Sequence, residues 1–340
     1  MSAHTSAPVE LNADVGEFVP PGEEAAAAAV LGMLETVVRN AYDKTNPKLA
    51  RRDAHAKAHG VVKATFKVLD NLSPDLKVGI FAEPATYDAW IRYSNGNTTP
   101  QADSVGDGRG MAIKLMNVPG SPSTTQDFLM INFPAFFCRN APDYVIFQKN
   151  PMKFFFSFWN PIKFRLKEAW VAFSIARQTV RNPLNIRYWS MTPYLFGDFA
   201  CKFSAKPRDP LSKFTGSAGP DFLRDNMAAQ LAEGGVTFDF MVQRRTNPAT
   251  MPVEDPTVTW SETESPFVPI ATITIPQQIF DTPAQNTFAE NLTYTPWHCI
   301  PAHRPLGGIN RLRKVVYDGI SRLRHELNHV VRKEPTDFSI

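Results

Sequence analysis

The chain has 340 residues, of which 43% are hydrophobic and 20% charged, so it can bury a large core and is not a disordered chain. Its 36 basic and 33 acidic residues give a net charge of +3, which is too balanced to indicate nucleic acid as a partner. The three cysteines, Cys138, Cys201 and Cys299, are far apart and form no CxxC pair. Neither a disulfide framework nor a zinc site is therefore expected, and a reducing compartment is predicted.

The N-terminal segment carries no basic stretch followed by an apolar one, so no signal peptide is expected. No apolar run of about eighteen residues occurs, so no membrane span is expected. These features predict a cytoplasmic protein without integral membrane association. Residues 1–20 are predicted to form a flexible arm, and residues 21–340 a single domain.

The hydrophobic pattern predicts a helix first and then a series of strands. Residues 22–46 carry Ala, Leu, Val and Met at helical spacing. Alternating or apolar stretches bounded by turn residues predict strands at 60–70, 77–83, 87–94, 110–116 and 126–138. Further strands are predicted for FACKFSAKP, VTFDFMVQRRT and PFVPIATITIPQQ, and a helix with a basic face for residues 310–333. Antiparallel strands followed by helices indicate an α+β fold with a β-barrel or sandwich at its centre.

Residues 151–192 differ from the strands around them. The segment is aromatic, basic and partly helical, and its charges exclude a membrane span. The simplest interpretation is a helical excursion packed on the sheet. The alternatives are the wall of a substrate channel or a patch that contacts a membrane surface peripherally.

Two sets of residues carry chemistry. Arg313 and Tyr317 are four residues apart, so they share one face of the C-terminal helix. A tyrosine has a pKa of about 10 and needs help to act as an anionic ligand, which a ferric ion and a nearby arginine supply. The other reading is a tyrosine packed on the core beneath a snorkelling arginine. His55, in RRDAHAK, lies between two alanines before a strand, and a lone histidine of this kind is usually structural.

The order of these motifs along the chain resembles the haem catalase superfamily, over roughly residues 45–330. AHAK resembles the distal-histidine segment, and IRYS a strand with an Arg-aromatic-Ser pattern. DSVGDGRGMAIK and INFPAFFCRN resemble the turn and strand that follow, and RKVVYDGISRLR the proximal segment. The resemblance implies a catalase-like antiparallel β-barrel with surrounding helices that lacks the C-terminal helical domain of full-length catalases.

The resemblance also implies a haem b cofactor with named ligands. Tyr317 would be the axial ligand of the iron, kept ionised by Arg313. His55 would take a proton from the peroxide oxygen nearest the iron and return it to the leaving oxygen. Ser94 would hold the His55 ring by a hydrogen bond. Asn132 would orient the peroxide, although the matching position could instead be Ile131.

Further residues match the cofactor-binding positions of the family. Arg52, Arg92 and Arg324 fall where the family binds the two haem propionates, because buried carboxylates need cationic partners. Tyr144 falls where the family stacks a phenylalanine on the haem, and Phe147 at a nearby channel phenylalanine. Ordinary salt-bridge or core roles are the alternatives for all five residues.

Several features depart from full catalases. The long threading arm and the C-terminal helical domain have no counterpart, and no NADPH site can be identified. Ala54 precedes His55 where catalases usually carry Val and coral-type allene oxide synthases carry Thr. Ser321 replaces a histidine found in many catalases. The smaller Ala54 side chain leaves room above the iron for a bulkier peroxide or an organic donor, so efficient dismutation of hydrogen peroxide is not the expected activity.

Three functions follow from these observations. The first is a catalase-related peroxidase that uses a peroxide and an organic electron donor. The second is a fatty-acid hydroperoxide isomerase or lyase, similar to allene oxide synthase, whose partner would be a lipid hydroperoxide. The third is a non-catalytic haem carrier or sensor. A homodimer is the expected assembly.

Overall fold

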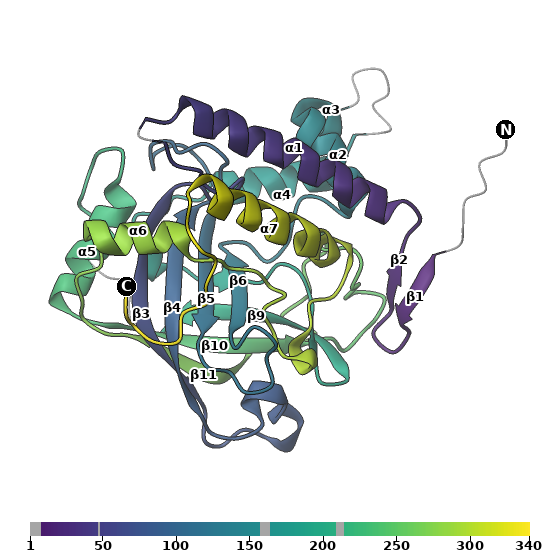
Figure 1. Cartoon of the computed structure of the whole chain (residues 1–340). Coiled ribbons are helices and arrows are strands. Elements are labelled where there is room, and N and C mark those ends of the chain that lie inside the picture. Colours follow the sequence, from purple (N-terminus) through teal and green to yellow (C-terminus); the bar gives the residue numbers. More distant parts are fainter. Residues whose placement is uncertain (1–7, 47, 157–163, 209–213) are drawn as a thin grey trace.

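A closed antiparallel β-barrel forms the centre of the protein (Figure 1). The computed structural model describes residues 8–46, 48–156, 164–208 and 214–340. The barrel strands are β3 (Ala58–Val68), β4 (Thr86–Asn95), β5 (Arg109–Leu115), β6 (Gln126–Ile131), β7 (Tyr188–Trp189), β9 (Phe199–Pro207), β10 (Val236–Arg244) and β11 (Val268–Ile275). They pair in the order β10-β11-β3-β4-β5-β6-β7-β9, and β9 closes the barrel on β10, while the short strand β8 (Tyr194–Phe196) extends β9. The predicted α+β class with a central antiparallel β-barrel is confirmed.

Because side chains alternate along each strand, the barrel has an apolar interior and an outer face that carries polar and charged side chains. On β4, Ile91 and Tyr93 belong to the large core inside the barrel. The intervening residues Arg92 and Ser94 point to the opposite face of the sheet, because successive side chains of a strand alternate. The barrel interior is filled with aromatic and aliphatic side chains. Polar groups of the central strands are therefore directed to the outer face.

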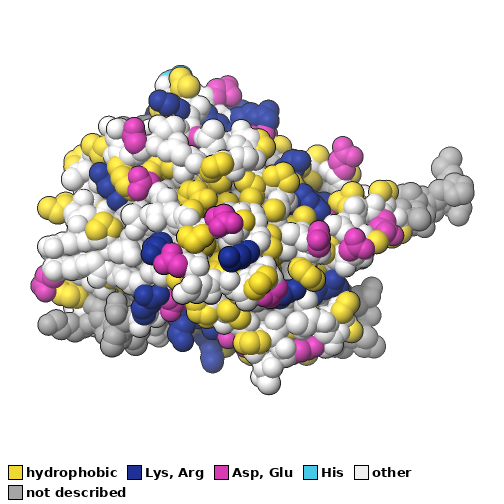
Figure 2. All heavy atoms as spheres, turned by 90° about the horizontal axis from the view of Figure 1, so that it is seen from below, with side chains coloured by type: hydrophobic (Ala, Val, Ile, Leu, Met, Phe, Trp, Pro, Cys, Tyr) yellow, Lys and Arg dark blue, Asp and Glu magenta, His cyan; other side chains and the backbone are white. Residues whose placement is uncertain are grey.

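The helices cover that outer face. The bounds are α1 (Glu23–Lys44), α2 (Ala141–Lys149), α3 (Pro151–Phe155), α4 (Leu166–Ala176), α5 (Phe222–Glu233), α6 (Pro283–Asn291) and α7 (Gly308–Leu327). Short 3-10 turns cover Pro74–Leu76, Gly79–Phe81, Pro183–Asn185 and Pro301–His303. Helices α1 and α7 lie side by side above β4–β6 and share a second apolar core (Figure 1). The face seen from below carries interspersed acidic and basic side chains (Figure 2).

The predicted flexible arm is wrong for the residues that can be compared. Residues 1–7 lie outside the described residues, whereas β1 (Val9–Asn12) and β2 (Glu17–Val19) form an antiparallel hairpin. Glu17 is fully buried and accepts from Arg304 at 2.7 Å and from Arg311 at 3.1 Å. A buried carboxylate needs such partners, so this ion pair anchors the hairpin to the start of α7.

Three other element predictions need correction. The strand predicted at 77–83 is a 3-10 turn at Gly79–Phe81, because Gly79 adopts a positive φ of 56° and the Ile80 amide donates to His303 Nε2. The strand predicted at 126–138 ends at Ile131, before Pro134. The last helix ends at Leu327 rather than 333, and the following residues run back along the barrel.

The aromatic 151–192 segment contains α3, α4 and β7, and residues 157–163 lie outside the described residues. Val171 and Ile175 on the inner face of α4 are buried against Ile131 and Met191. The opposite face of α4 exposes large apolar side chains: Leu166, Trp170 and Phe173. Among the described helices, none has the length and apolar character needed to cross a membrane.

Candidate functional site

A cavity with an empty volume of about 730 Å³ lies between the outer face of β4–β6 and helix α7. Three paired strands form its floor. In their register Arg92 of β4 lies opposite Ala112 of β5, Ser94 lies opposite Gly110, and Gly110 in turn lies opposite Ile131 of β6. We call it the inner cavity. Its remaining lining residues are Arg52, Asp53, Ala54, His55, Met111, Leu129, Met130, Met191, Thr293, Tyr294, Arg313, Tyr317, Ile320, Ser321 and Arg324.

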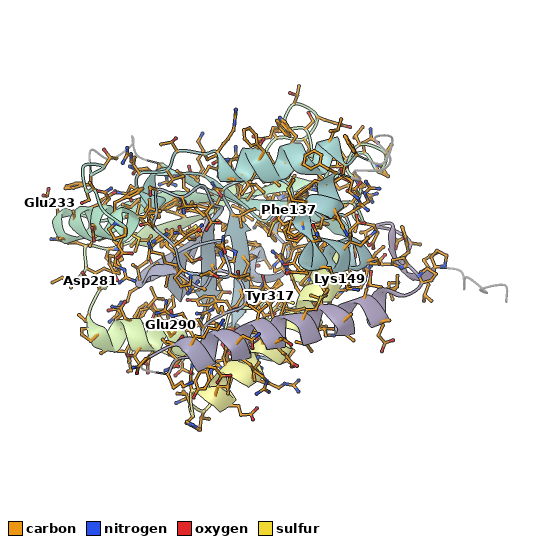
Figure 3. The ribbon with its side chains drawn as sticks, turned by 90° about the horizontal axis from the view of Figure 1, so that it is seen from above. Phe137, Lys149, Glu233, Asp281, Glu290 and Tyr317 are labelled. Carbon is orange, nitrogen blue, oxygen red and sulfur yellow. The ribbon has the colours of Figure 1, made fainter. Side chains whose placement is uncertain are left out.

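Helix α7 supplies one wall through a single face. Arg313, Tyr317, Ile320, Ser321 and Arg324 all line the inner cavity, with the spacing of three and four residues that places side chains on one face. The Arg313 guanidinium lies 5.8 Å from the centre of the Tyr317 ring. Figure 3 shows Tyr317 beside the α1–α7 pair, with Phe137 on the side of α2 and α4. Cationic charge is therefore held next to the tyrosine.

His55 faces Tyr317's helix from the barrel side. Its Nδ1 shares a hydrogen bond of 3.0 Å with Ser94 Oγ, the contact that the resemblance implies. The backbone of His55 is in the left-handed region, at φ 58°, and is held there by His55 N donating to the Gly96 carbonyl at 3.1 Å and by Arg92 donating to the His55 carbonyl at 2.8 Å. Such a conformation persists only where the surroundings enforce it, and it is common at functional sites.

A glycine makes room for the His55 ring. A Cβ on Gly110 would lie 2.7 Å from two ring atoms of His55 and 2.9 Å from Ser94 Oγ. Burial, with the neighbouring charges of Arg92, Arg313 and Arg52, lowers the pKa of His55 to about 3. The imidazole is therefore neutral near pH 7 and able to accept a proton.

Arg52, Arg92 and Arg324 converge at one end of the inner cavity, around the carboxylate of Glu290. Arg52 lies 3.6 Å from that carboxylate, and Arg324 donates to the Glu290 carbonyl. Among the described residues, Arg52 Nη1, Arg92 Nε and Arg324 Nε are buried with no hydrogen-bond partner. Burial, together with the charge of Arg52, lowers the pKa of Arg92 to about 9 and that of Arg324 well below its usual range. Three cations thus share one buried anion, and anionic groups would stabilise the cluster.

The predicted role of Asn132 needs correction, because its side chain lines neither of the cavities described here. Its Oδ1 accepts from the Arg109 amide at 2.8 Å, and its Nδ2 donates to Gln178 at 2.9 Å. Ile131 points into the cavity instead, since adjacent residues of a strand point to opposite faces. The position opposite His55 is therefore apolar.

A second cavity, the outer cavity, joins the inner one at a shared set of residues. It has an empty volume of about 1440 Å³, and both cavities are lined by Asp53, Ala54, His55, Ile131, Met191, Arg313 and Tyr317. Tyr144 and Phe147 line the outer cavity, as do Phe136 and Phe137, whose rings lie 4.5 Å apart. Ile175 of α4 also lines it, so the aromatic segment contributes to the cavity wall.

Two residues of the cavities, Asp53 and Gly110, were not predicted from the sequence to have a functional role. Asp53 stands inside the quoted RRDAHAK segment and lines both cavities. The sequence did not indicate a role for its carboxylate, because an aspartate side chain is usually exposed to solvent. Gly110 could have been found from GRG before a strand, where a glycine often marks a close approach.

Comparisons with known proteins bear on the fold and on part of the sequence. Residues 32–153 match the family described as catalase. No curated protein matches the chain. Among solved structures, a fungal catalase has a TM-score of 0.66 at 19% identity, covering 84% of this chain and 61% of its own. A bacterial catalase has a TM-score of 0.65 at 17% identity, covering 90% and 64%. Catalase A from Saccharomyces cerevisiae has 0.64 at 19%, covering 85% and 64%.

The chain thus spans less than two thirds of the length of these catalases, while they cover most of it. The matched segment contains the site-bearing residues from Arg52 to Phe147, and the shared fold adds the α7 side of the cavity. Residues 32–153 thus match the catalase family, and the chain as a whole shares the fold of solved catalases.

Proposed function

We propose that this protein is a haem-dependent oxidoreductase that metabolises peroxides, a catalase-related peroxidase. Tyr317 would ligate a ferric haem b, and His55 would act as the acid–base residue on the opposite side. One observation carries the proposal: three arginines with unpaired buried nitrogen atoms line the same cavity as Tyr317 and His55.

The donor set fits a haem. Its two propionates would meet Arg52, Arg92 and Arg324, whose unpaired nitrogen atoms are charged donors suited to carboxylates. The apolar residues Leu129, Ile131 and Ile320 would contact the porphyrin. Tyrosinate is the ligand class of haem iron in catalases, and Arg313 supplies the positive charge that favours the ionised phenol.

When bound, the haem supplies the two-electron redox chemistry needed to break a peroxide O–O bond. The chain's own residues handle the proton. Neutral His55 would accept the peroxide proton, and a proton must then reach the leaving oxygen. Ser94 fixes the ring through Nδ1, which leaves Nε2 for the peroxide. Gly110 allows the ring to lie against β5.

A fatty-acid hydroperoxide isomerase or lyase is the second candidate. Ala54 and the phenylalanine wall of the outer cavity, which includes Phe136, Phe137 and Phe147, favour a long apolar substrate. Incubation of the haem-loaded protein with several regioisomers of a polyunsaturated fatty-acid hydroperoxide, followed by product analysis, tests it. Recovery of unchanged hydroperoxide in every case would remove this candidate.

The first experiment follows oxygen release from hydrogen peroxide and oxidation of an organic donor, per haem. The Tyr317→Phe variant should lose or strongly change the ferric haem spectrum and lose turnover. Tyr87→Phe, a partly buried tyrosine on β4 outside both cavities, is the matched control and should leave both unchanged. An unchanged Tyr317→Phe spectrum would contradict the proximal assignment.

His55 separates an enzyme from a haem carrier. General acid–base help is commonly worth about 10²–10⁴-fold in rate, so His55→Ala should remove most peroxide turnover while haem remains bound. A carrier would keep its function in this variant. Full peroxide turnover without His55 would contradict the acid–base assignment.

A further inference from the structure

Asp53 is a buried carboxylate at the junction of the inner and outer cavities. It lines both of them, together with Ala54 and His55, and only 9% of the residue is exposed. Its carboxylate is held by backbone hydrogen bonds of Asp53 and Ala54, no described side chain hydrogen-bonds to it, and Arg324 and Arg52 lie close enough to influence its charge. The carboxylate therefore lies in the same cavity wall as His55 without a side-chain hydrogen-bond partner among the described residues.

The opposite side of the cavity lacks a polar group. Ile131 of β6 faces the cavity with an apolar side chain, and the Asn132 amide is committed to Arg109 and Gln178. His55 is thus without an amide partner on β6. Asp53 is the carboxylic acid that lines the cavity on the His55 side, two residues before the histidine.

We propose that Asp53 is a second proton-transfer residue of this site, which donates a proton to the leaving oxygen of the peroxide while His55 acts as the base. This inference rests on the proposed haem-dependent function. Asp53, in the loop before β3, would supply the polar group that β6 does not provide at Ile131.

The surroundings shift the pKa values of Asp53 and His55 in opposite directions. Burial raises the pKa of Asp53 to about 6, against the lowering effect of its backbone hydrogen bonds and of Arg324 and Arg52. Burial and the arginines lower the pKa of His55 to about 3. Near neutral pH the site therefore holds a neutral base and a carboxyl that is partly protonated, a pairing suited to acid and base roles.

The proton balance closes on these two residues. His55 takes the proton from the peroxide oxygen nearest the iron, and Asp53 gives a proton to the other oxygen. That oxygen would keep both electrons of the O–O bond and leave as water or an alcohol, and a bound haem would supply the two electrons that the remaining oxygen needs. The proton on His55 would then pass to the ionised Asp53, so the net result is one proton moved between the two oxygens.

Other charged and titratable groups face Asp53, and each could shift its behaviour. Arg52 precedes it, Arg324 comes from α7 and Tyr144 from α2, and Glu290 lies among the arginines. Arg313 and Tyr317 line the same two cavities. The test therefore changes Asp53 itself and compares pH profiles.

Cyanide affinity of the ferric, haem-loaded protein gives a readout that does not depend on turnover. A protonated Asp53 can donate a hydrogen bond to bound cyanide, whereas an ionised one repels it. The wild type should lose cyanide affinity as the pH rises through about 6. Asp53→Asn should abolish this step, and Asp53→Glu should keep a step with a shifted midpoint. Asp88→Asn, an exposed aspartate on β4, should behave as wild type.

Turnover should follow the same pattern. Asp53→Asn should slow the reaction with peroxide by about 10²-fold at pH 6, in the range of general acid catalysis. Adding Ile131→Asn to Asp53→Asn should restore part of the rate, because an amide then faces the peroxide from β6. An unchanged cyanide profile and rate in Asp53→Asn would overturn the inference while leaving the haem function intact. If the wild type binds no haem, both fail.

A measurement on the haem-free protein shows that the variant folds. Because the folded-state pKa of Asp53 is raised, its ionisation destabilises the fold above pH 6, and this penalty disappears as the pH falls toward 4. Asp53→Asn should therefore have a higher Tm than wild type at pH 8 and an equal one near pH 4. An equal Tm at both pH values would contradict the buried, partner-poor carboxylate on which the inference depends.

Discussion

Replacing Arg324 by Met should affect haem binding and the stability of the haem-free protein in opposite directions. Arg324 is buried among Arg52 and Arg92, and its Nε has no partner among the described residues. Burial and repulsion from Arg52 lower its pKa well below the ordinary range, which means that the fold is disfavoured by its charge. Met has a similar length and no charge, so the haem-free variant should be as stable as wild type or more stable.

The haem-bound state should show the reverse. A hydrogen bond to a charged group contributes about 1.5–3 kcal/mol, and a tenfold change corresponds to about 1.4 kcal/mol. Losing the one unpaired donor of Arg324 should therefore weaken haem binding by roughly 10- to 150-fold. Absorption titration with haem and the rate of haem transfer to an excess of a haem-scavenging protein measure this loss, and thermal unfolding measures stability.

Arg322 provides the control on the same helix. Its side chain is 74% exposed and, within the part of the chain that the structure describes, is paired only with Asp318, so Arg322→Met should change haem affinity little. If Arg324→Met binds haem as tightly as Arg322→Met, the arginine cluster does not hold the propionates. If it destabilises the haem-free protein, the reasoning about repulsion among the arginines is wrong.

Gly110→Ala should leave haem binding intact and reduce the peroxide rate by about 10²-fold, because the new Cβ forces the His55 ring out of place. Stopped-flow mixing with peroxide measures that rate. The Tm of the haem-free protein should fall from pH 7 to pH 4, in part because the pKa of His303 is lowered by burial to about 4 and the unfolded chain takes up the proton first. His303→Gln should make this fall smaller. If α4 contacts membrane surfaces, anionic vesicles should bind the wild type, and Trp170→Ser should weaken that binding in a sedimentation assay.

Two of these predictions have a control variant that should show no change. Gly32→Ala, on α1 with no atom close to the added Cβ, should keep the peroxide rate. Ile279→Ser, at a residue that is 75% exposed outside α4, should keep vesicle binding. A Tm profile of His303→Gln as steep as that of wild type would contradict the titration argument. Binding of Trp170→Ser to vesicles at wild-type strength would remove the membrane-surface interpretation.

Much of the secondary structure could be read from the sequence. The strand FACKFSAKP matches β9 at both ends, and the helix predicted at 22–46 matches α1 within two residues. Periodicity works there because one face of each element is buried and the other is not. The strand predicted at 77–83 was wrong, since the apolar residues Ile80 and Phe81 enter the core from a 3-10 turn. A short apolar run does not distinguish these two cases.

The sequence by itself determined which residue types are available for the site and that Arg313 and Tyr317 share a helix face, because helical spacing is a local property. It also determined the α+β class through its strand and helix periods. Only the tertiary structure decided that Ile131 rather than Asn132 faces the cavity, since one residue of strand register exchanges the two faces. It alone placed Asp53 at the junction of two cavities and left one nitrogen atom on each of Arg52, Arg92 and Arg324 without a hydrogen-bond partner among the described residues. Burial and the meeting of α7 with β4–β6 depend on contacts between residues far apart in the chain.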